Sequence, residues 1–159
     1  MRWIWIDKFI EFVSGSHASA VKNVTLAEEH LKDHFPGYPV MPSSLVIEGM
    51  AQTAGILVGE SRSFQENVIL AKIRHARFDD WAVPGDQLQF NARLDSIDES
   101  AATTTGDVLL NGRPIGEVSL MFSHVSAKKG VPGLPTENFV FTEQFMRLFE
   151  AFAGSVRKS

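Results

Sequence analysis

Two side chains that can exchange protons near neutral pH, His34 and Glu48, lie fourteen positions apart in the middle of the chain. A histidine can act as a general base, and a carboxylic acid can protonate a leaving group. The pair therefore offers the two groups that general acid–base catalysis needs. What such a pair does depends on the elements that hold each member.

Glu48 is surrounded by apolar neighbours in a segment that reads as a helix over residues 43–60. Burying an ionised carboxylate without a partner costs much free energy, so we expect Glu48 to be neutralised or hydrogen-bonded. Gln52 lies four residues on, on the same helix face, and could hold Glu48 in place. A structural role for Glu48 agrees with these observations as well as a functional one does.

His34 opens a segment, residues 34–42, that contains three prolines and one glycine. Such a segment forms neither a helix nor an ordinary strand, and its fixed φ angles make it a stiff loop that can aim a side chain. Taken alone, a loop histidine bonded to the backbone is the more common case. The remaining histidines lack comparable surroundings: His17, His30, His75 and His124.

Other chemistries find less support in the sequence. His30 and His34 are four apart, near three acidic residues (Glu28, Glu29 and Asp33), but a proline two positions after His34 ends any shared helix. The acidic residues follow no known metal-ligand pattern, so we disfavour a metal site. The sequence has no Gly-x-Ser-x-Gly elbow, no Gly-rich phosphate loop and no cysteine, so a serine hydrolase, a phosphate-binding loop and a cysteine nucleophile are disfavoured too.

The helix at 43–60 is apolar on nearly every face, which is typical of a buried helix. Ser43 and Ser44 suit its start, and Pro42 suits its first turn. Gly49, Gly55 and Gly59 lower its helix propensity, and we expect another backbone to approach closely there.

The rest of the chain reads mainly as strands. Two are expected before the helix, with a short turn or loop at 26–33, and four after it. An Asn-Gly pair at 111–112 marks a hairpin, so the sheet should be antiparallel. The simplest architecture that buries such a helix is an α+β fold in which a curved sheet wraps around it. The expected strands are residues 3–13 (interrupted near Asp7), 18–25, 68–78, 87–97, 101–110 and 114–125.

The length, composition and charge of the chain limit the classes of protein to which it can belong. The 159 residues suffice for one domain, 44% of them are hydrophobic, and the net charge is −4. No basic excess points to nucleic acid or a membrane surface, and no apolar run reaches the roughly 18 residues of a membrane helix. We see no signal peptide and expect a soluble cytoplasmic protein.

We expect one catalytic domain at residues 1–125, followed by a C-terminal part at 126–159. Within that part, residues 126–138 read as a linker and 142–153 as an amphipathic helix packed on this subunit or on a neighbour. The apolar stripe of that helix consists of Phe145, Leu148, Phe149 and Phe152.

The segment His-Phe-Pro-Gly-Tyr-Pro-Val-Met-Pro at 34–42, followed by Leu-Val-Ile-Glu-Gly-Met-Ala-Gln at 45–52, closely resembles the β-hydroxyacyl-acyl-carrier-protein dehydratases of type II fatty-acid synthesis. The spacing from histidine to glutamate matches as well. Shorter matching motifs lie at 21–25, 76–78, 83–86 and 116–122, so the resemblance spans about residues 3–125.

This resemblance implies a hot-dog fold, an antiparallel sheet wrapped around one long helix. It implies a homodimer in which His34 faces Glu48 of the partner subunit, and trimers of dimers (hexamers) also occur in the family. The implied reaction removes water from a (3R)-3-hydroxyacyl thioester and leaves the trans-2-enoyl thioester. No cofactor or metal is needed for this elimination.

The resemblance also assigns roles to single residues. His34 removes the α-proton, and Glu48 helps the β-hydroxyl leave. The N–H of Ser43 stabilises the charge on the thioester oxygen, as a helix N-terminus favours. Backbone groups of Gly37 and Val40 lie beside the substrate, and the Val40 carbonyl orients the histidine. Gln52 supports the acid.

Three features depart from the family. Ser43 stands where glycine is usual, the N-terminal residues 2–5 are divergent, and the tail at 126–159 has no counterpart. They suggest a specialised paralogue. The acid at position 48 is Glu, which is typical of the branch that dehydrates without isomerising the double bond.

Two further functions stay open: an acyl thioesterase on the same fold, and a non-catalytic acyl-binding subunit. The acyl group would be carried by acyl carrier protein or by coenzyme A. Because a carrier protein is acidic, its docking site should be basic, and Lys72, Arg74 and Arg77 are the candidates. A solvated strand face would explain these three charges equally well.

Overall fold

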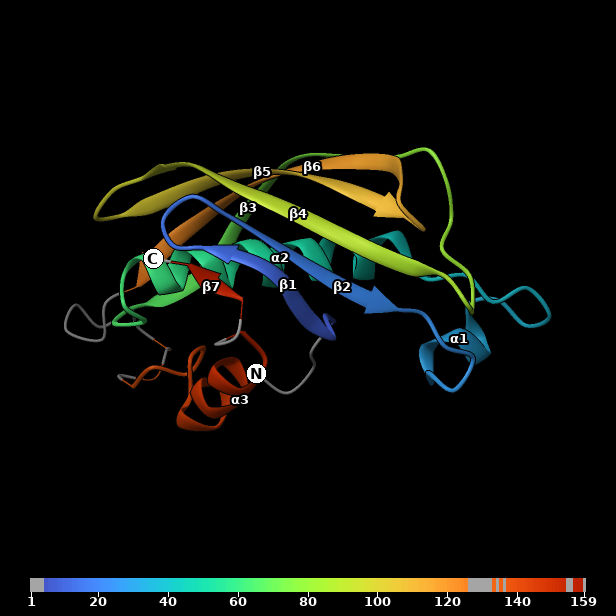
Figure 1. The fold of residues 1–159 in the computed structure, drawn as a ribbon, viewed down its shortest axis with the longest axis horizontal. Coiled ribbons are helices and arrows are strands. Elements are labelled where there is room, and N and C mark those ends of the chain that lie inside the picture. Colours follow the sequence, from blue (N-terminus) through green and yellow to red (C-terminus); the bar gives the residue numbers. More distant parts are fainter. Residues whose placement is uncertain (1–4, 126–132, 134, 136, 154–155, 159) are drawn as a thin grey trace.

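A computed structural model describes residues 5–125, 133, 135, 137–153 and 156–158. A curved sheet covers one long helix, α2 (Ser43–Ser61), as Figure 1 shows. This is the hot-dog arrangement that the sequence predicted. The strands are β1 (Lys8–Val13), β2 (His17–Asn23), β3 (Asn67–Phe78), β4 (Gln87–Ile97), β5 (Ala101–Leu110), β6 (Arg113–Val125) and β7 (Arg157–Lys158).

The sheet has the strand order β3-β6-β5-β4-β2-β1-β7. Neighbours in it are antiparallel except β1 and β7, which run parallel. Buried and half-buried residues alternate along the whole of β5, as expected of a sheet with one face on the core. The covered face carries large side chains onto α2, among them Phe90, Leu120 and Phe122.

The central helix begins at Ser43, as predicted, but Pro42 is the residue before it rather than part of its first turn. Neither serine forms a side-chain cap. The expectation that other backbones approach its glycines was wrong. Aromatic rings fill these places instead: a Cβ at Gly49 would overlap the ring of Phe90, and one at Gly59 would overlap the ring of Phe141.

The segment between β2 and the His34 loop is more ordered than the sequence indicated. A single helical turn, α1 (His30–Asp33), stands in the expected loop, and Leu31 anchors it with only 2% of its surface exposed. The described part of the first strand begins at Lys8, after the Asp7 position where an interruption was expected.

The C-terminal helix α3 (Glu143–Ala153) packs on β1 of the same chain and lies below it in Figure 1. The ring of Phe149 meets the rings of Phe9 and Phe12 edge-on, and Phe145 is buried beside it. Leu148, expected in the same stripe, is 39% exposed, and the side chain of Phe152 lies outside the described residues.

The short strand β7 follows α3 and was not predicted. Most of the expected linker at 126–138 lies outside the described residues. Within the part of the chain that is described, no helix has the length and apolarity to cross a membrane.

Candidate active site

The loop after α1 holds His34 in a fixed orientation. Its ring Nδ1 lies 3.1 Å from the carbonyl oxygen of Val40, and the N–H of Val40 donates to the His34 carbonyl at 2.9 Å. Between them, Phe35 and Tyr38 exchange two backbone hydrogen bonds, of 3.0 and 2.9 Å. Gly37 lies at the tip with φ +77°, a conformation that glycine adopts readily.

This contact determines which nitrogen of His34 can accept a proton. A carbonyl oxygen only accepts hydrogen bonds, so Nδ1 must carry the hydrogen. Neutral imidazole has its lone pair on the other nitrogen, so Nε2 is the basic atom. The His34 side chain is half-buried, and the ring of Phe35 stacks on it at 4.2 Å.

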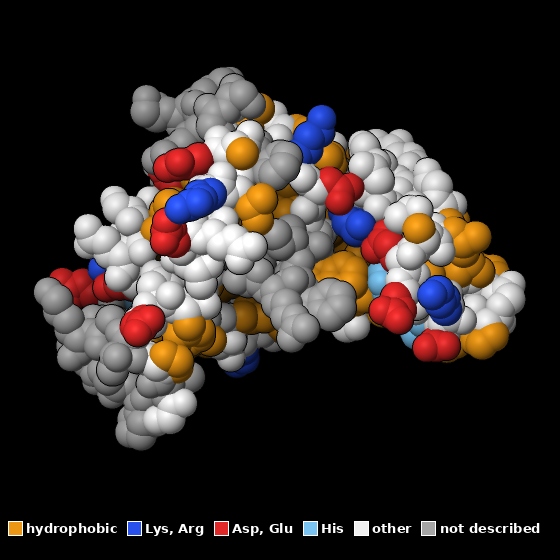
Figure 2. Space-filling model, turned by 90° about the horizontal axis from the view of Figure 1, so that it is seen from below, with side chains coloured by type: hydrophobic (Ala, Val, Ile, Leu, Met, Phe, Trp, Pro, Cys, Tyr) orange, Lys and Arg blue, Asp and Glu red, His pale blue; other side chains and the backbone are white. Residues whose placement is uncertain are grey.

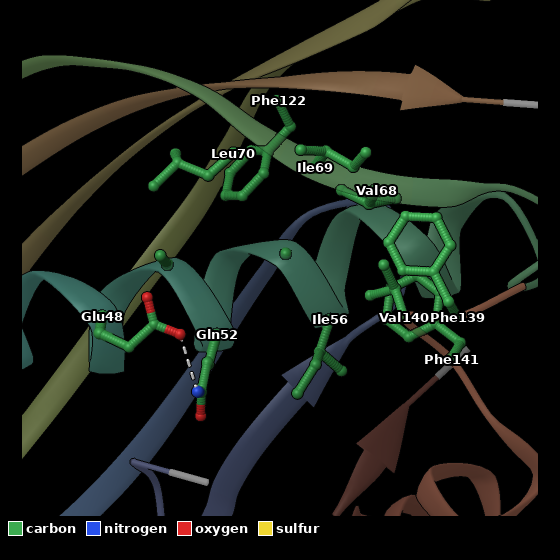
Figure 3. A pocket seen from close by; sticks show the side chains of 12 residues that line it. Glu48, Gln52, Ile56, Val68, Ile69, Leu70, Phe122, Phe139, Val140 and Phe141 are labelled. Carbon is green, nitrogen blue, oxygen red and sulfur yellow. Dashed lines mark hydrogen bonds between the residues drawn. The ribbon is translucent and has the colours of Figure 1, made fainter. Parts of the chain in front are cut away.

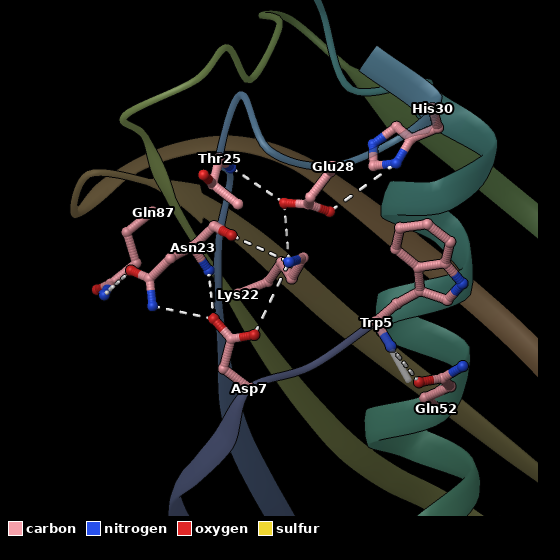
Figure 4. Close-up of polar contacts among 9 residues, drawn as sticks. All are labelled: Trp5, Asp7, Lys22, Asn23, Thr25, Glu28, His30, Gln52 and Gln87. Atoms are coloured by element: carbon pink, nitrogen blue, oxygen red, sulfur yellow. Dashed lines mark hydrogen bonds and ion pairs between the residues drawn. The ribbon is translucent and has the colours of Figure 1, made fainter. Parts of the chain in front are cut away.

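Glu48 is held by the residue one turn further along α2. Gln52 donates from Nε2 to Oε1 of Glu48 at 2.9 Å (Figure 3). The other end of the amide, Oε1 of Gln52, accepts the backbone N–H of Trp5 at 2.8 Å (Figure 4). Because an amide oxygen cannot donate, the Trp5 N–H fixes the amide so that its NH₂ group faces Glu48.

A buried lysine supports the segment that carries Trp5. The side chain of Lys22 is 10% exposed and lies 3.0 Å from Glu28 and 3.8 Å from Asp7. Asp7 in turn accepts the backbone and side-chain N–H groups of Asn23, and Glu28 accepts the backbone N–H of Thr25. This network, drawn in Figure 4, ties the chain before β1 to the chain before α1.

His30 belongs to the same surroundings, although the sequence gave it no role. Its ring meets the Trp5 ring edge-on at 5.1 Å, and its Nδ1 lies 3.9 Å from Glu28. Burial lowers the pKa of His30 below its usual value, and the charges of Lys22 and His34 act in the same direction, against Glu28. Its Nε2 is buried and has no hydrogen-bond partner among the described residues. Its position one turn before His34 was the only signal for it in the sequence.

Glu48 lies in the walls of two hollows. One is an apolar cavity of about 390 Å³ between α2, β3 and residues 139–141. The other is a wider, more polar groove of about 880 Å³. At the end of the molecule that carries α1, Figure 2 shows histidine side chains among acidic and basic ones, with hydrophobic side chains alongside. The groove is lined by Trp5, Glu28, Glu29, His30, Asp33, Leu45 and Glu48.

Among the described residues, no hydrogen bond or ion pair joins His34 and Glu48 within one chain, and His34 lines neither of the two hollows described above for Glu48. Ser43 is the first residue of α2, where a backbone N–H has no carbonyl partner within the helix. Among the described residues, no group of three His, Cys, Asp or Glu is arranged to hold a metal ion.

The three basic candidates for carrier docking are all exposed on β3. Lys72 pairs with Met121 of β6, and Arg77 pairs with Glu117. Both partners face away from the helix, so Lys72 and Arg77 lie on the outer face of the sheet. Arg74 lies at the second shift and has no register partner. Arg77 is engaged by Asp79 at 2.8 Å, so the charge at Lys72 and Arg74 is the less neutralised part of this surface.

The sequence of this chain is similar to those of known proteins. The FabA-like domain matches residues 4–119 of this chain. A 3-hydroxyacyl-[acyl-carrier-protein] dehydratase FabZ of Listeria monocytogenes is 34% identical over 122 residues, 76% of this chain and 85% of that protein. The FabZ of Shewanella frigidimarina is 32% identical over 131 residues, 80% of this chain and 86% of that protein.

Solved structures are similar in fold. The dehydratase heterocomplex ApeI:P of Xenorhabdus doucetiae superposes with a TM-score of 0.62 at 20% identity, over 76% of this chain and 82% of that chain. A conserved protein of Pseudomonas aeruginosa gives 0.61 at 14% identity, over 74% and 87%. At these identities the likeness supports the fold alone.

Proposed function

The chain belongs to the FabA-like family, with the FabZ dehydratases as relatives, and from this premise we propose that it is a hydro-lyase acting on 3-hydroxyacyl thioesters. The substrate is a (3R)-3-hydroxyacyl group on acyl carrier protein or coenzyme A, and the product is the trans-2-enoyl thioester. The observation that carries the proposal is that a hydrogen bond orients each of the two side chains: the Val40 carbonyl orients His34, and the Gln52 amide orients Glu48.

In the proposed reaction, Nε2 of His34 takes the proton from C2 of the substrate. The electron pair of that C–H bond forms the C2–C3 double bond, and the C3–O bond breaks. Since Oε1 of Glu48 accepts from Gln52, Oε2 is the oxygen that delivers a proton to the departing hydroxyl, which leaves as water. The proton on His34 then returns to Glu48 through solvent, and the site is reset.

Charge builds on the thioester oxygen as the C2 proton leaves, and donors aimed at it lower the barrier. The N–H of Ser43 is suited to this role because it stands at the N-terminus of a 19-residue helix. Backbone groups of Gly37 and Val40 are proposed to line the substrate on the His34 side.

We propose further that each site is completed by a second copy of the chain, with His34 of one copy facing Glu48 of the other. Among the described residues of one chain, His34 and Glu48 each have another hydrogen-bond partner and none joins the two, which supports this arrangement. So does β3, which is the last strand of the sheet and, within the described part of the chain, has one edge without a neighbouring strand. Ile73 of β3 pairs with buried Leu120 and so faces the helix side, yet it is 46% exposed.

The experiment follows enoyl absorbance during dehydration of 3-hydroxyacyl thioesters by the unaltered chain and by His34→Ala and Glu48→Gln. Activity that is present in the first and lost in both variants supports the proposal. Release of free acid and thiol without an enoyl product would identify a thioesterase. Tight binding of acyl thioesters with no turnover would identify an acyl-binding subunit.

A further inference from the structure

The apolar cavity beside Glu48 runs along α2 and has a distinct far end. In Figure 3, Glu48 lies at one end, and Phe139, Val140 and Phe141 lie at the other. Helix residues and strand β3 form the walls between them. Apart from Glu48 and Gln52, the lining is apolar: Ala51, Gly55, Ile56, Val68, Ile69, Leu70, Phe122, Phe139, Val140 and Phe141.

The segment at the far end is fastened by its backbone. The side-chain oxygen of Asn67, a residue only 2% exposed, accepts the N–H of Phe139 at 2.9 Å and of Val140 at 3.1 Å. Asn138 accepts the N–H of Val140 and of Phe141, at 3.1 and 2.7 Å. Four hydrogen bonds to buried or half-buried acceptors thus hold this end wall in place.

Phe141 closes the end with a firmly packed ring. It lies over Gly59, the one place in that turn of α2 where the absence of a Cβ leaves room for it. Its ring meets Phe64 and Phe145 at 4.9 and 5.3 Å, and the residue is 6% exposed. A wall of this kind yields little to a longer ligand, because close-packed interiors resist the insertion of even single methylenes.

We propose that residues 139–141 are the stop of an acyl-chain pocket that begins at Glu48, and that they limit the substrate to acyl groups of medium length. This inference rests on the proposed dehydration, which places C3 of the substrate at Glu48 and its alkyl tail in the cavity. The segment lies beyond residue 119, where the family match ends, so the limit is a property of this chain's own tail.

The geometry gives a length. From Glu48 to Ile56 the helix rises about 1.5 Å per residue, or about 12 Å in all. With carbon–carbon bonds of about 1.5 Å and angles near 111°, an extended alkyl chain advances about 1.3 Å per carbon. Roughly nine carbons therefore fit beyond C3, and acyl groups of about twelve carbons fill the pocket.

The test uses two readouts on the full chain. Turnover is measured for 3-hydroxyacyl thioesters of about 4 to 16 carbons, and binding is measured for saturated acyl pantetheine thioesters of the same lengths, which carry no hydroxyl to eliminate. For the unaltered chain, affinity should rise with length up to about 12 carbons and fall beyond it.

Phe141→Ala and the milder Phe139→Ala, at a half-buried position, should extend this optimum. The ratio of kcat/KM for 16 over 8 carbons should rise by about ten- to two-hundredfold, the range for a changed fit in an apolar pocket. Gly55→Ala should shift the optimum to shorter chains, because its new methyl would enter the cavity wall at an ordinary 3.4 Å from Phe122. Phe149→Ala is the matched control, since Phe149 is equally buried but lines a different hollow.

An unchanged length profile in both phenylalanine variants would overturn the inference, as would an equal shift in Phe149→Ala. If neither the unaltered chain nor any variant shows dehydration, while the chain length bound best still changes in Phe139→Ala, the pocket is supported and the proposed reaction is rejected. If dehydration proceeds but the preferred chain length is the same in all variants, the proposed reaction is supported and the role of residues 139–141 as the end of the pocket is rejected.

Discussion

The carbonyl oxygen of Val40 lies 3.1 Å from Nδ1 of His34, so a backbone group rather than a carboxylate orients the proposed base. A neutral carbonyl fixes the tautomer without adding a negative charge beside the imidazole. The orientation therefore depends on the shape of the loop between the two residues, which the backbone hydrogen bonds of Phe35 and Tyr38 maintain.

Replacing His34 by alanine should lower kcat/KM for dehydration by about 10²- to 10⁴-fold, the usual contribution of a general base. The side chain is half-buried in a surface loop, so the melting temperature should change little. Enoyl absorbance and thermal unfolding measure the two effects. His17→Ala, which removes a histidine on β2, is the control and should retain full activity. Comparable activity in His34→Ala would rule the residue out as base.

Gln52→Leu should reduce kcat more than it raises KM, because it leaves the Glu48 carboxyl without the donor that directs it. It should also destabilise the fold by about 1–3 kcal/mol, since the Trp5 N–H loses its acceptor. Thr53→Ala is the matched control, because it deletes a buried hydrogen bond to Gly49 on the same helix without touching Glu48. Equal kinetic losses in the two variants would mean that Gln52 only stabilises the helix.

His30 should make stability depend on pH. Burial lowers the pKa of His30 from its ordinary 6.5, so the unfolded chain binds this proton more readily than the folded chain. Stability is then complete above pH 6.5 and falls as the pH drops below that value. Urea unfolding at several pH values should show a smaller acid loss in His30→Gln than in the unaltered chain. An identical pH profile in both would contradict this account.

Charge reversal at Lys72 and Arg74 should weaken carrier-bound substrates far more than pantetheine thioesters of the same acyl chain. An acidic carrier is attracted by these two exposed positive charges, whereas a small thioester does not contact them. Each reversal should raise KM for the carrier substrate by several-fold, and the effect should shrink as salt is added. Arg93→Glu, at an exposed position on β4, is the control. Equal effects on both substrate types would reject the docking surface.

The fold was largely predictable because its elements leave strong local signals. Alternation along β5 and the apolar run of α2 are periodic, and the Asn-Gly pair at 111–112 marks the turn between β5 and β6. The predictions from sequence failed where packing between distant segments determines the structure. No local pattern shows that the ring of Phe90 fills the space at Gly49, or that a two-residue β7 adds to β1.

The candidate site was predictable only in part, for the same reason. The contact between Glu48 and Gln52 follows from helix spacing, and the resemblance implied the one between His34 and Val40. By contrast, the Trp5 N–H reaches Gln52 across 47 positions, and residues 139–141 close the cavity from the far end of the chain. Contacts between segments so distant in sequence are set by the tertiary fold and leave no periodic signal.

The proposed sharing of each site between two copies predicts rescue between two inactive variants. In a two-fold dimer of His34→Ala with Glu48→Gln, one site carries both changes and the other carries neither. If the copies are mixed at random in equal amounts, half of the dimers are mixed, so about a quarter of all sites are intact. Unfolding and refolding the two variants together should therefore recover about a quarter of the unaltered activity, whereas each refolded alone should stay inactive. The control is a mixture of His34→Ala with a double variant that carries both changes, in which no dimer has an intact site. If His34 and Glu48 act within one chain instead, the first mixture stays as inactive as the control, because no copy in it has both residues.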